Sequence, residues 1–129
     1  MNKILIDTQS FIWFMEDNKH LPASMRTLMN DSGYQLTISM ACLWEMTIKM
    51  SLSKLALSAD IATIMSEAQA NGFEFLFIEP AHLVTLSTLA PIHRDPFDRI
   101  MIAQAITENM PIISSDKVFE QYPVNRLWT

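Results

Sequence analysis

The sequence has a single cysteine, Cys42, and only two glycines among 129 residues. One cysteine cannot form a disulfide within the chain or build a cysteine-based zinc site, so the fold depends on its apolar core. So few glycines disfavour a loop-rich β protein and favour helices. No apolar run reaches the roughly 18 residues of a membrane span, and Asp7 interrupts the first apolar run before a signal peptide could form. We therefore expect a cytoplasmic protein without a membrane segment.

Positive charge is also scarce. Nine lysines and arginines stand against fourteen aspartates and glutamates, which gives a formal net charge of −5. This balance argues against broad, non-specific binding of a polyanion through a basic face. Any contact with nucleic acid must be local, whereas a cation held by acids, or a basic partner, suits the sign of the charge.

Apolar residues, by contrast, are abundant. They make up 50% of the chain and charged residues 18%, which excludes an intrinsically disordered protein. The length predicts a single domain over residues 1–129. A chain of this size buries roughly two thirds of the surface that its unfolded form exposes.

Short, uniformly apolar runs alternate with helical segments along the sequence. The expected strands are 4–6, 36–38, 73–78, 111–114 and an edge strand at 125–128. The expected helices are 11–14, 21–30, 39–50, 60–71, 80–88 and 95–109, with a short helical turn after Asp116. This alternation predicts an α/β fold with three layers, in which helices cover both faces of a mainly parallel sheet of four to five strands.

Acidic residues follow several of these elements at positions that suit a shared site. In an open parallel sheet, ligands bind beyond the carboxyl ends of the strands. Asp7 ends the first strand, Asp116 follows the fourth, and Asp98 lies in the first turn of the helix at 95–109. Glu45 lies within an almost wholly apolar helix, where an unpaired carboxylate is costly.

Each acid also has a purely structural interpretation. Asp7 and Asp116 suit the N-cap of the helical segments that follow them. Glu45 can pair with Lys49, four residues on, in the favourable order. The segment 95–98 has the pattern of a capping box, with Asp95 as the N-cap, proline first and Asp98 third. These interpretations stand beside the functional one.

One shared cause explains all four acids more simply than four coincidences. Two carboxylates about 4 Å apart repel by roughly 4 kcal/mol at an effective dielectric constant of 20, so a cluster of four requires a cation. Ligands that are all oxygen select a hard ion such as Mg²⁺ or Mn²⁺. Such an ion lowers the pKa of bound water and holds a phosphate oxygen, so the predicted chemistry is phosphodiester hydrolysis.

Several segments, in their order and spacing, also carry a family resemblance. They are 5–8 (LIDT), 38–39 (IS) with 43–49 (LWEMTIK), 93–99 (HRDPFDR), 102–105 (IAQA) and 114–116 (SSD). On these segments the chain resembles a PIN-domain ribonuclease of the VapC type, the toxin of a bacterial toxin–antitoxin pair. The resemblance runs from Ile4 to Trp128, and its most specific part is the segment 93–99.

The resemblance implies a PIN-like fold and a metal-dependent endoribonuclease that binds one or two Mg²⁺ or Mn²⁺ ions and cuts RNA by in-line attack of water. The implied catalytic residues and metal ligands are Asp7, Glu45, Asp98 and Asp116. The implied supporting residues, beside the acids rather than on the ion, are Thr8, Asp95 and Ser114. One departure is Gln9, which stands where this subgroup usually has histidine.

The resemblance also implies partners: an RNA substrate, a cognate VapB-type antitoxin that places a basic side chain among the acids, and a second copy of the chain in a homodimer. Arg94, Arg99 and Lys117 are candidates for weak contacts with the RNA backbone, with salt bridging as their alternative. The competing function is a catalytically inert PIN-fold module that binds antitoxin or RNA, which Gln9 alone favours. A receiver-type phosphotransfer domain is disfavoured because Asp7 stands alone after its strand.

Overall fold

The strands of the protein form one sheet in which all neighbouring strands are parallel. The computed structural model describes residues 2–129. The strands are β1 (Asn2–Ile6), β2 (Tyr34–Ser39), β3 (Glu74–Leu76), β4 (Ile112–Ile113) and β5 (Arg126–Leu127). Their order in the sheet is β3-β2-β1-β4-β5. The expected α/β class is therefore confirmed, with a five-stranded sheet that is wholly rather than mainly parallel.

Strand β1 is the centre of this sheet and fixes the level at which its neighbours end. Its last three residues, 4–6, are apolar and at most 1% exposed, as a strand covered on both faces requires. Ile6 pairs with Ile38 of β2 on one side and with Ile113 of β4 on the other. The residues that follow these three positions, Asp7 among them, therefore emerge side by side at the carboxyl edge of the sheet.

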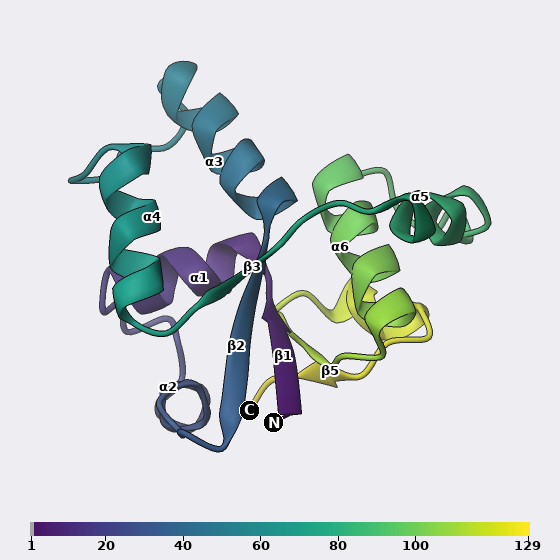
Figure 1. Ribbon diagram of the computed structural model, residues 1–129, viewed down its shortest axis with the longest axis horizontal. Coiled ribbons are helices and arrows are strands. Elements are labelled where there is room, and N and C mark those ends of the chain that lie inside the picture. Colours follow the sequence, from purple (N-terminus) through teal and green to yellow (C-terminus); the bar gives the residue numbers. More distant parts are fainter. Residues whose placement is uncertain (1) are drawn as a thin grey trace.

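The helices divide between the two faces of the sheet. They are α1 (Thr8–Met15), α2 (Ala23–Met29), α3 (Met40–Ser51), α4 (Ile61–Ala70), α5 (Pro80–Ser87), α6 (Pro96–Glu108) and the 3₁₀ helix η1 (Lys117–Gln121). The chain moves from β1 to β2 to β3 in one direction and returns across the sheet to β4. Right-handed crossovers then place α1, α2 and α4 on one side and α5 and α6 on the other, as Figure 1 shows.

Helix α3 differs from the other helices in its position. It begins at the carboxyl end of β2 and rises beyond the edge of the sheet (Figure 1), where it contacts α1, α4 and α6. The space beyond the strands is thus bordered by the first turns of α1 and α6 and by one face of α3. None of the helices within residues 2–129 is long and apolar enough to cross a bilayer.

Most expected elements differ from the structure by a few residues at their ends, and three of these differences are informative. The helix expected at 11–14 begins at Thr8, because the Asp7 side chain caps it. The strand expected at 73–78 pairs only over Glu74–Leu76, and Phe77 and Ile78, which looked like buried strand residues, are 60% and 38% exposed. The strand expected at 111–114 is reduced to Ile112–Ile113. The first two differences arise from a side-chain cap and from an edge position, neither of which hydrophobic periodicity reports.

Candidate active site

Four acidic side chains line one pocket at the carboxyl edge of the sheet. The pocket has a volume of about 330 Å³. Its acidic residues are Asp7, Glu45, Asp98 and Asp116, and the other residues that line it include Thr8, Gln9, Lys49, Lys54 and Ser115. The acids come from four separate parts of the chain. The structure thus brings together around one pocket the four side chains that the sequence singled out.

Asp7 follows β1 directly and caps α1. Its Oδ1 atom accepts a hydrogen bond from the backbone N–H of Ser10 at 2.9 Å, and the residue is only 6% exposed. Burial raises the pKa of Asp7, and the negative charge of Asp116 adds to that shift. The capping interpretation is therefore correct for Asp7, and the same residue also borders the acidic pocket.

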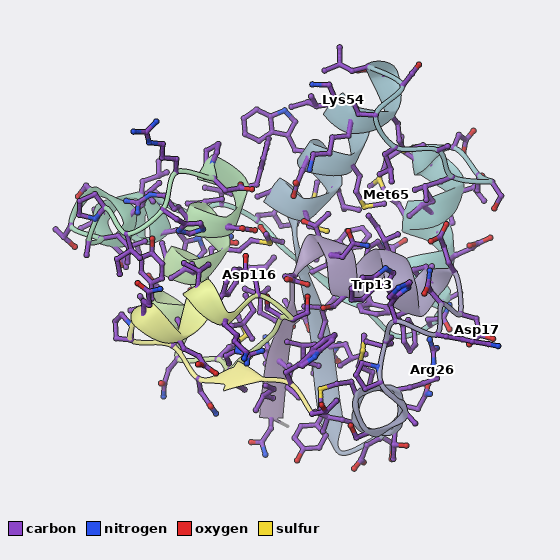
Figure 2. All side chains as sticks on the ribbon, turned by 180° about the vertical axis from the view of Figure 1, so that it is seen from behind. Trp13, Asp17, Arg26, Lys54, Met65 and Asp116 are labelled. Atoms are coloured by element: carbon purple, nitrogen blue, oxygen red, sulfur yellow. The ribbon has the colours of Figure 1, made fainter. Side chains whose placement is uncertain are left out.

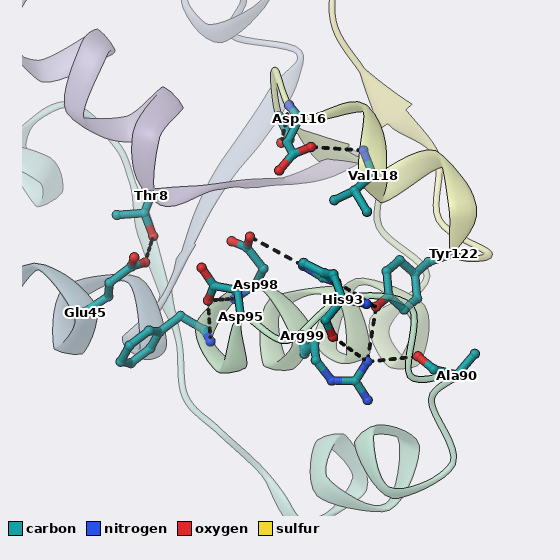
Figure 3. Close-up of polar contacts among 12 residues, drawn as sticks. Thr8, Glu45, Ala90, His93, Asp95, Asp98, Arg99, Asp116, Val118 and Tyr122 are labelled. Atoms are coloured by element: carbon teal, nitrogen blue, oxygen red, sulfur yellow. Dashed lines mark hydrogen bonds and ion pairs between the residues drawn. The ribbon is translucent and has the colours of Figure 1, made fainter.

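Glu45 is buried on α3 with a partner on each carboxylate oxygen. Its Oε1 atom accepts a hydrogen bond from Thr8 Oγ1 at 2.7 Å (Figure 3), and its Oε2 atom lies 2.6 Å from Lys49 Nζ. This carboxylate raises the pKa of Lys49, chiefly through that hydrogen bond. The ion pair with Lys49, expected from the spacing of four residues, is confirmed.

Asp98 lies one turn into α6, behind a cap made by Asp95. The Oδ1 atom of Asp95 accepts hydrogen bonds from the backbone N–H groups of Phe97 and Asp98, at 2.9 and 3.1 Å. The Asp98 carboxylate lies 3.5 Å from His93 Nε2 instead of closing a capping box (Figure 3). Asp95 is therefore the N-cap, as expected. The side chain of Asp98 takes no part in capping and lines the pocket.

The protonation of Asp98 depends on burial and on the other acids of the site. Burial, followed by the charges of Asp95, Asp7, Glu45 and Asp116, raises the pKa of Asp98 to about 7. All three of the other predicted ligands contribute to this shift. At neutral pH the Asp98 carboxyl is therefore only partly ionised in the metal-free pocket.

Asp116 completes the pocket from the segment after β4. Figure 2 shows it near the middle of the molecule, with Lys54 farther out beyond the end of α3. One carboxylate oxygen accepts a hydrogen bond from Val118 N–H at 3.0 Å and caps η1, and the Asp116 N–H donates to Ser114 Oγ at 3.1 Å. The capping interpretation is correct here too. Ser114 fixes the backbone of Asp116 through the hydrogen bond that its hydroxyl accepts.

The donor set suits a hard divalent cation, but the side chains are not assembled around one. Among residues 2–129, no three His, Cys, Asp or Glu side chains approach closely enough to form a ready metal-binding group. Instead, Thr8 and Lys49 hold Glu45, and local N–H groups hold Asp7 and Asp116. The expectation that only a cation makes the gathering tolerable needs correction, because Lys49 also compensates the charge. The oxygen-only chemistry and the raised pKa of Asp98 still fit Mg²⁺ or Mn²⁺.

A comparison with protein-family models identifies the family. The model of the PIN domain matches residues 4–125. The chain belongs to the PIN-domain family. PIN domains are generally nucleases. No curated protein gives a significant match to this sequence.

Several solved structures share the fold of this chain. A chain of VapBC2 from Rickettsia felis, bound to a DNA fragment from its promoter, has a TM-score of 0.73 and 13% identity, with 97% of each chain covered. A chain of DNA-bound VapBC from Salmonella typhimurium gives 0.68, 16% identity and 98% of each chain. A chain of a toxin–antitoxin complex from Klebsiella pneumoniae gives 0.67 and 16% identity, with 97% and 96% covered. At these identities the likeness establishes the fold that this PIN domain shares with them.

The basic residues that could contact RNA in this PIN domain differ in whether their side chains already make hydrogen bonds within the protein. The Arg99 guanidinium donates hydrogen bonds to the carbonyls of Ala90 and Leu89 and to the Tyr122 hydroxyl, at 2.8, 3.3 and 3.1 Å. Arg99 is thus committed to holding the segment before α6. Arg94 and Lys117 are exposed and remain candidates for RNA contact, as does Lys54, which borders the pocket itself.

One residue that contacts the acidic site was not assigned a role from the sequence. His93 lies beside Asp98, with its Nε2 atom 3.5 Å from Oδ2 of the carboxylate. The available signal was its place in the segment 93–99, two residues before the Asp95 cap and five before Asp98. That spacing alone does not show that the ring turns back toward the first turn of α6.

Proposed function

We propose that the protein is a divalent-cation-dependent endoribonuclease that acts as the toxin of a toxin–antitoxin pair. The observation that carries the proposal is the shared pocket: four carboxylates from separate elements line it, and burial together with the charges of neighbouring carboxylates raises the pKa of Asp98 to about 7. The family supports nuclease chemistry. The fold supports the toxin role, because the solved structures that share it are described as VapBC or toxin–antitoxin complexes.

The residues of the pocket have distinct tasks in this proposal. Asp7, Glu45, Asp98 and Asp116 would hold one or two Mg²⁺ or Mn²⁺ ions, which would supply an activated water and a contact for a phosphate oxygen. Thr8 keeps the Glu45 carboxylate turned toward the start of α1 through its 2.7 Å hydrogen bond. Lys49 and Lys54 place positive charge at the border of the pocket, where it attracts a phosphodiester.

The partners follow from the same proposal. A VapB-type antitoxin with a basic side chain would neutralise the acidic pocket, much as Lys49 already does for Glu45 within this chain. A net charge of −5 favours such a partner. RNA as the substrate and a homodimer as the assembly remain predictions from the family resemblance.

The test is RNA cleavage by the purified chain. We expect cleavage with Mg²⁺ or Mn²⁺, none in EDTA, and none from Asp7→Asn or Asp98→Asn. The matched control is Asp17→Asn, because Asp17 is an exposed acid outside the pocket whose left-handed backbone conformation asparagine adopts readily. Equal cleavage in EDTA, or by the two pocket variants, would contradict the proposal.

One observation favours the second candidate, an inert PIN-fold binding module. The ammonium group of Lys49 forms an ion pair with Oε2 of Glu45, so the negative charge of the pocket is partly neutralised without any metal. In that case the chain would bind RNA or an antitoxin and leave the RNA intact under every metal condition. The same assay, read together with a binding measurement, separates the two candidates.

A further inference from the structure

His93 sits between the acidic pocket and a buried tyrosine. Its Nε2 atom lies 3.5 Å from Asp98 Oδ2, and its Nδ1 atom lies 2.7 Å from the Tyr122 hydroxyl (Figure 3). The side chain of His93 is 18% exposed, and that of Asp98 21%. The histidine ring therefore spans the distance between the core and one acid of the site.

Counting hydrogen bonds at Tyr122 fixes which ring nitrogen carries the proton. The Tyr122 oxygen accepts one hydrogen bond from Arg99 Nη1 at 3.1 Å and one from the backbone N–H of His93 at 3.2 Å. With both acceptor positions taken, the hydroxyl hydrogen is left to donate to Nδ1 of His93. A neutral imidazole whose Nδ1 accepts carries its hydrogen on Nε2, the nitrogen that faces Asp98.

The orientation of the ring is held from several sides. Tyr122 is 4% exposed and meets the His93 ring edge-on, with ring centroids 5.4 Å apart. Arg99, which donates to Tyr122, is itself anchored on the carbonyls of Ala90 and Leu89. The Tyr122 hydroxyl therefore has a fixed position, and it fixes the ring of His93 in turn.

The Nε2–H group of His93 is a hydrogen-bond donor that faces the Asp98 carboxylate. Among the described residues, His93 Nε2 is buried from solvent and has no hydrogen-bond partner that meets ordinary geometry. A buried N–H without a partner is costly, so the neighbouring carboxylate is the acceptor toward which it is drawn. The 3.5 Å separation is longer than the roughly 2.7–3.2 Å of an ordinary N–H···O hydrogen bond, so the bond requires a closer approach of the Asp98 carboxylate.

We propose that His93 is a positioning residue of the acidic site: its Nε2–H holds Oδ2 of Asp98 and leaves the other oxygen to bind a divalent cation. The inference rests on the proposed function, because it concerns the ligand that Asp98 would provide. It goes beyond the four acids, since it extends the site through His93 and Tyr122 to Arg99. Partners that orient a metal-binding side chain affect metal affinity by roughly 10- to 100-fold when they are removed.

The test uses two amides that mimic different ring nitrogens. In His93→Gln the amide nitrogen reaches the position of Nε2 and can still donate to Asp98. In His93→Asn it reaches only the position of Nδ1. Titration calorimetry with Mn²⁺ alone is expected to give a dissociation constant roughly 10- to 100-fold higher for His93→Asn, and one close to that of the unmodified protein for His93→Gln. A merely structural role predicts similar losses of stability in both variants and unchanged Mn²⁺ affinity of the folded fraction.

A second measurement examines the ring directly in the metal-free protein. Two-bond ¹H–¹⁵N spectra are expected to show Nδ1 of His93 unprotonated and Nε2 protonated, and Tyr122→Phe is expected to increase the other tautomer and to weaken Mn²⁺ binding. A proton on Nδ1 in the unmodified protein, or full Mn²⁺ affinity in His93→Asn, overturns the proposal. Mn²⁺ binding that depends on His93 without RNA cleavage overturns the proposed function alone, and no Mn²⁺ binding by the unmodified protein overturns both.

Discussion

Asp98 is the residue whose protonation depends most visibly on its neighbours. Its pKa rises from 3.8 to about 7 because burial and four nearby carboxylates disfavour its charged form. Below about pH 4 it is protonated in both the folded and the unfolded chain and contributes no difference. As the pH rises from 4 to 7, only the unfolded chain ionises freely, so the folded state is progressively destabilised, and above pH 7 the full penalty remains.

We therefore predict that Asp98→Asn raises the thermal unfolding midpoint in EDTA, and that the gain over the unmodified protein grows between pH 4 and 7. The variant lacks the titrating group and so escapes the penalty. Thermal unfolding across this pH range measures the difference. A gain that is constant with pH would show that the acids do not act on Asp98 as described.

Lys49 is the residue that neutralises the site within the chain itself. Lys49→Met leaves the buried Glu45 carboxylate with only Thr8 as a partner, so we predict a loss of about 1–3 kcal/mol in the free energy of unfolding, measured with urea in EDTA. Mg²⁺ is expected to restore more stability to this variant than to the unmodified protein, because the ammonium no longer competes for Glu45. Equal restoration would contradict that competition.

For the individual residues of the site, the sequence predicted which side chains take part but not all of their contacts. Asp7, Glu45 and Asp116 could be chosen because they follow strands or interrupt an apolar helix. The Glu45–Lys49 ion pair could be predicted too, since residues four apart lie on one face of a helix. The contact between His93 and Asp98 was not, because it depends on Tyr122, which reaches the ring from nearly 30 residues away in the chain.

Among the elements, α6 is the one whose start places Asp98, and Asp95 is responsible for that start. Asp95→Ala removes the acceptor of two backbone N–H groups, so we predict a loss of about 1 kcal/mol in unfolding free energy, whereas Asp95→Asn keeps an acceptor oxygen and is close to neutral. Urea unfolding gives both values. RNA cleavage by Asp95→Asn is expected to survive, and its abolition would instead make Asp95 a ligand.

Helices were easier to predict than strands because their ends carry chemical signals. Ser39, Asp60 and Asp95 each cap the helix whose expected range begins at that residue. Strand β3 shows the limit: the apolar run at 73–78 looks like one buried strand, but pairing stops at Leu76 and Phe77 is exposed. A sequence reports that residues are apolar and not which of them lie at the end of an edge strand.

For the whole molecule, the sign of the charge limits how RNA can bind. The net charge is −5, and the exposed basic residues that line the pocket or adjoin its residues in the sequence are Lys49, Lys54, Arg94 and Lys117, so few phosphates can be neutralised. Each phosphate contact with single-stranded RNA contributes a slope of about −0.7 to log K against log salt, so we predict a slope shallower than about −3. Binding of single-stranded RNA in EDTA at several KCl concentrations measures it.

Arg94→Gln is expected to make that slope shallower by about 0.7, the contribution of one phosphate. Arg99→Gln is instead expected to lower stability and to leave the slope unchanged, since Arg99 is occupied by carbonyls and Tyr122. A steep slope, or one that depends on Arg99, would mean that RNA lies along a different surface.

Calorimetric titration of the metal-free protein with Mn²⁺ measures whether the four acids bind divalent cations together. We expect a saturable heat of binding at one or two sites, retained in Asp17→Asn and lost in both Asp7→Asn and Asp98→Asn. Binding heat that survives in the two pocket variants, or its absence from the unmodified protein, would show that the four acids do not form a shared metal site.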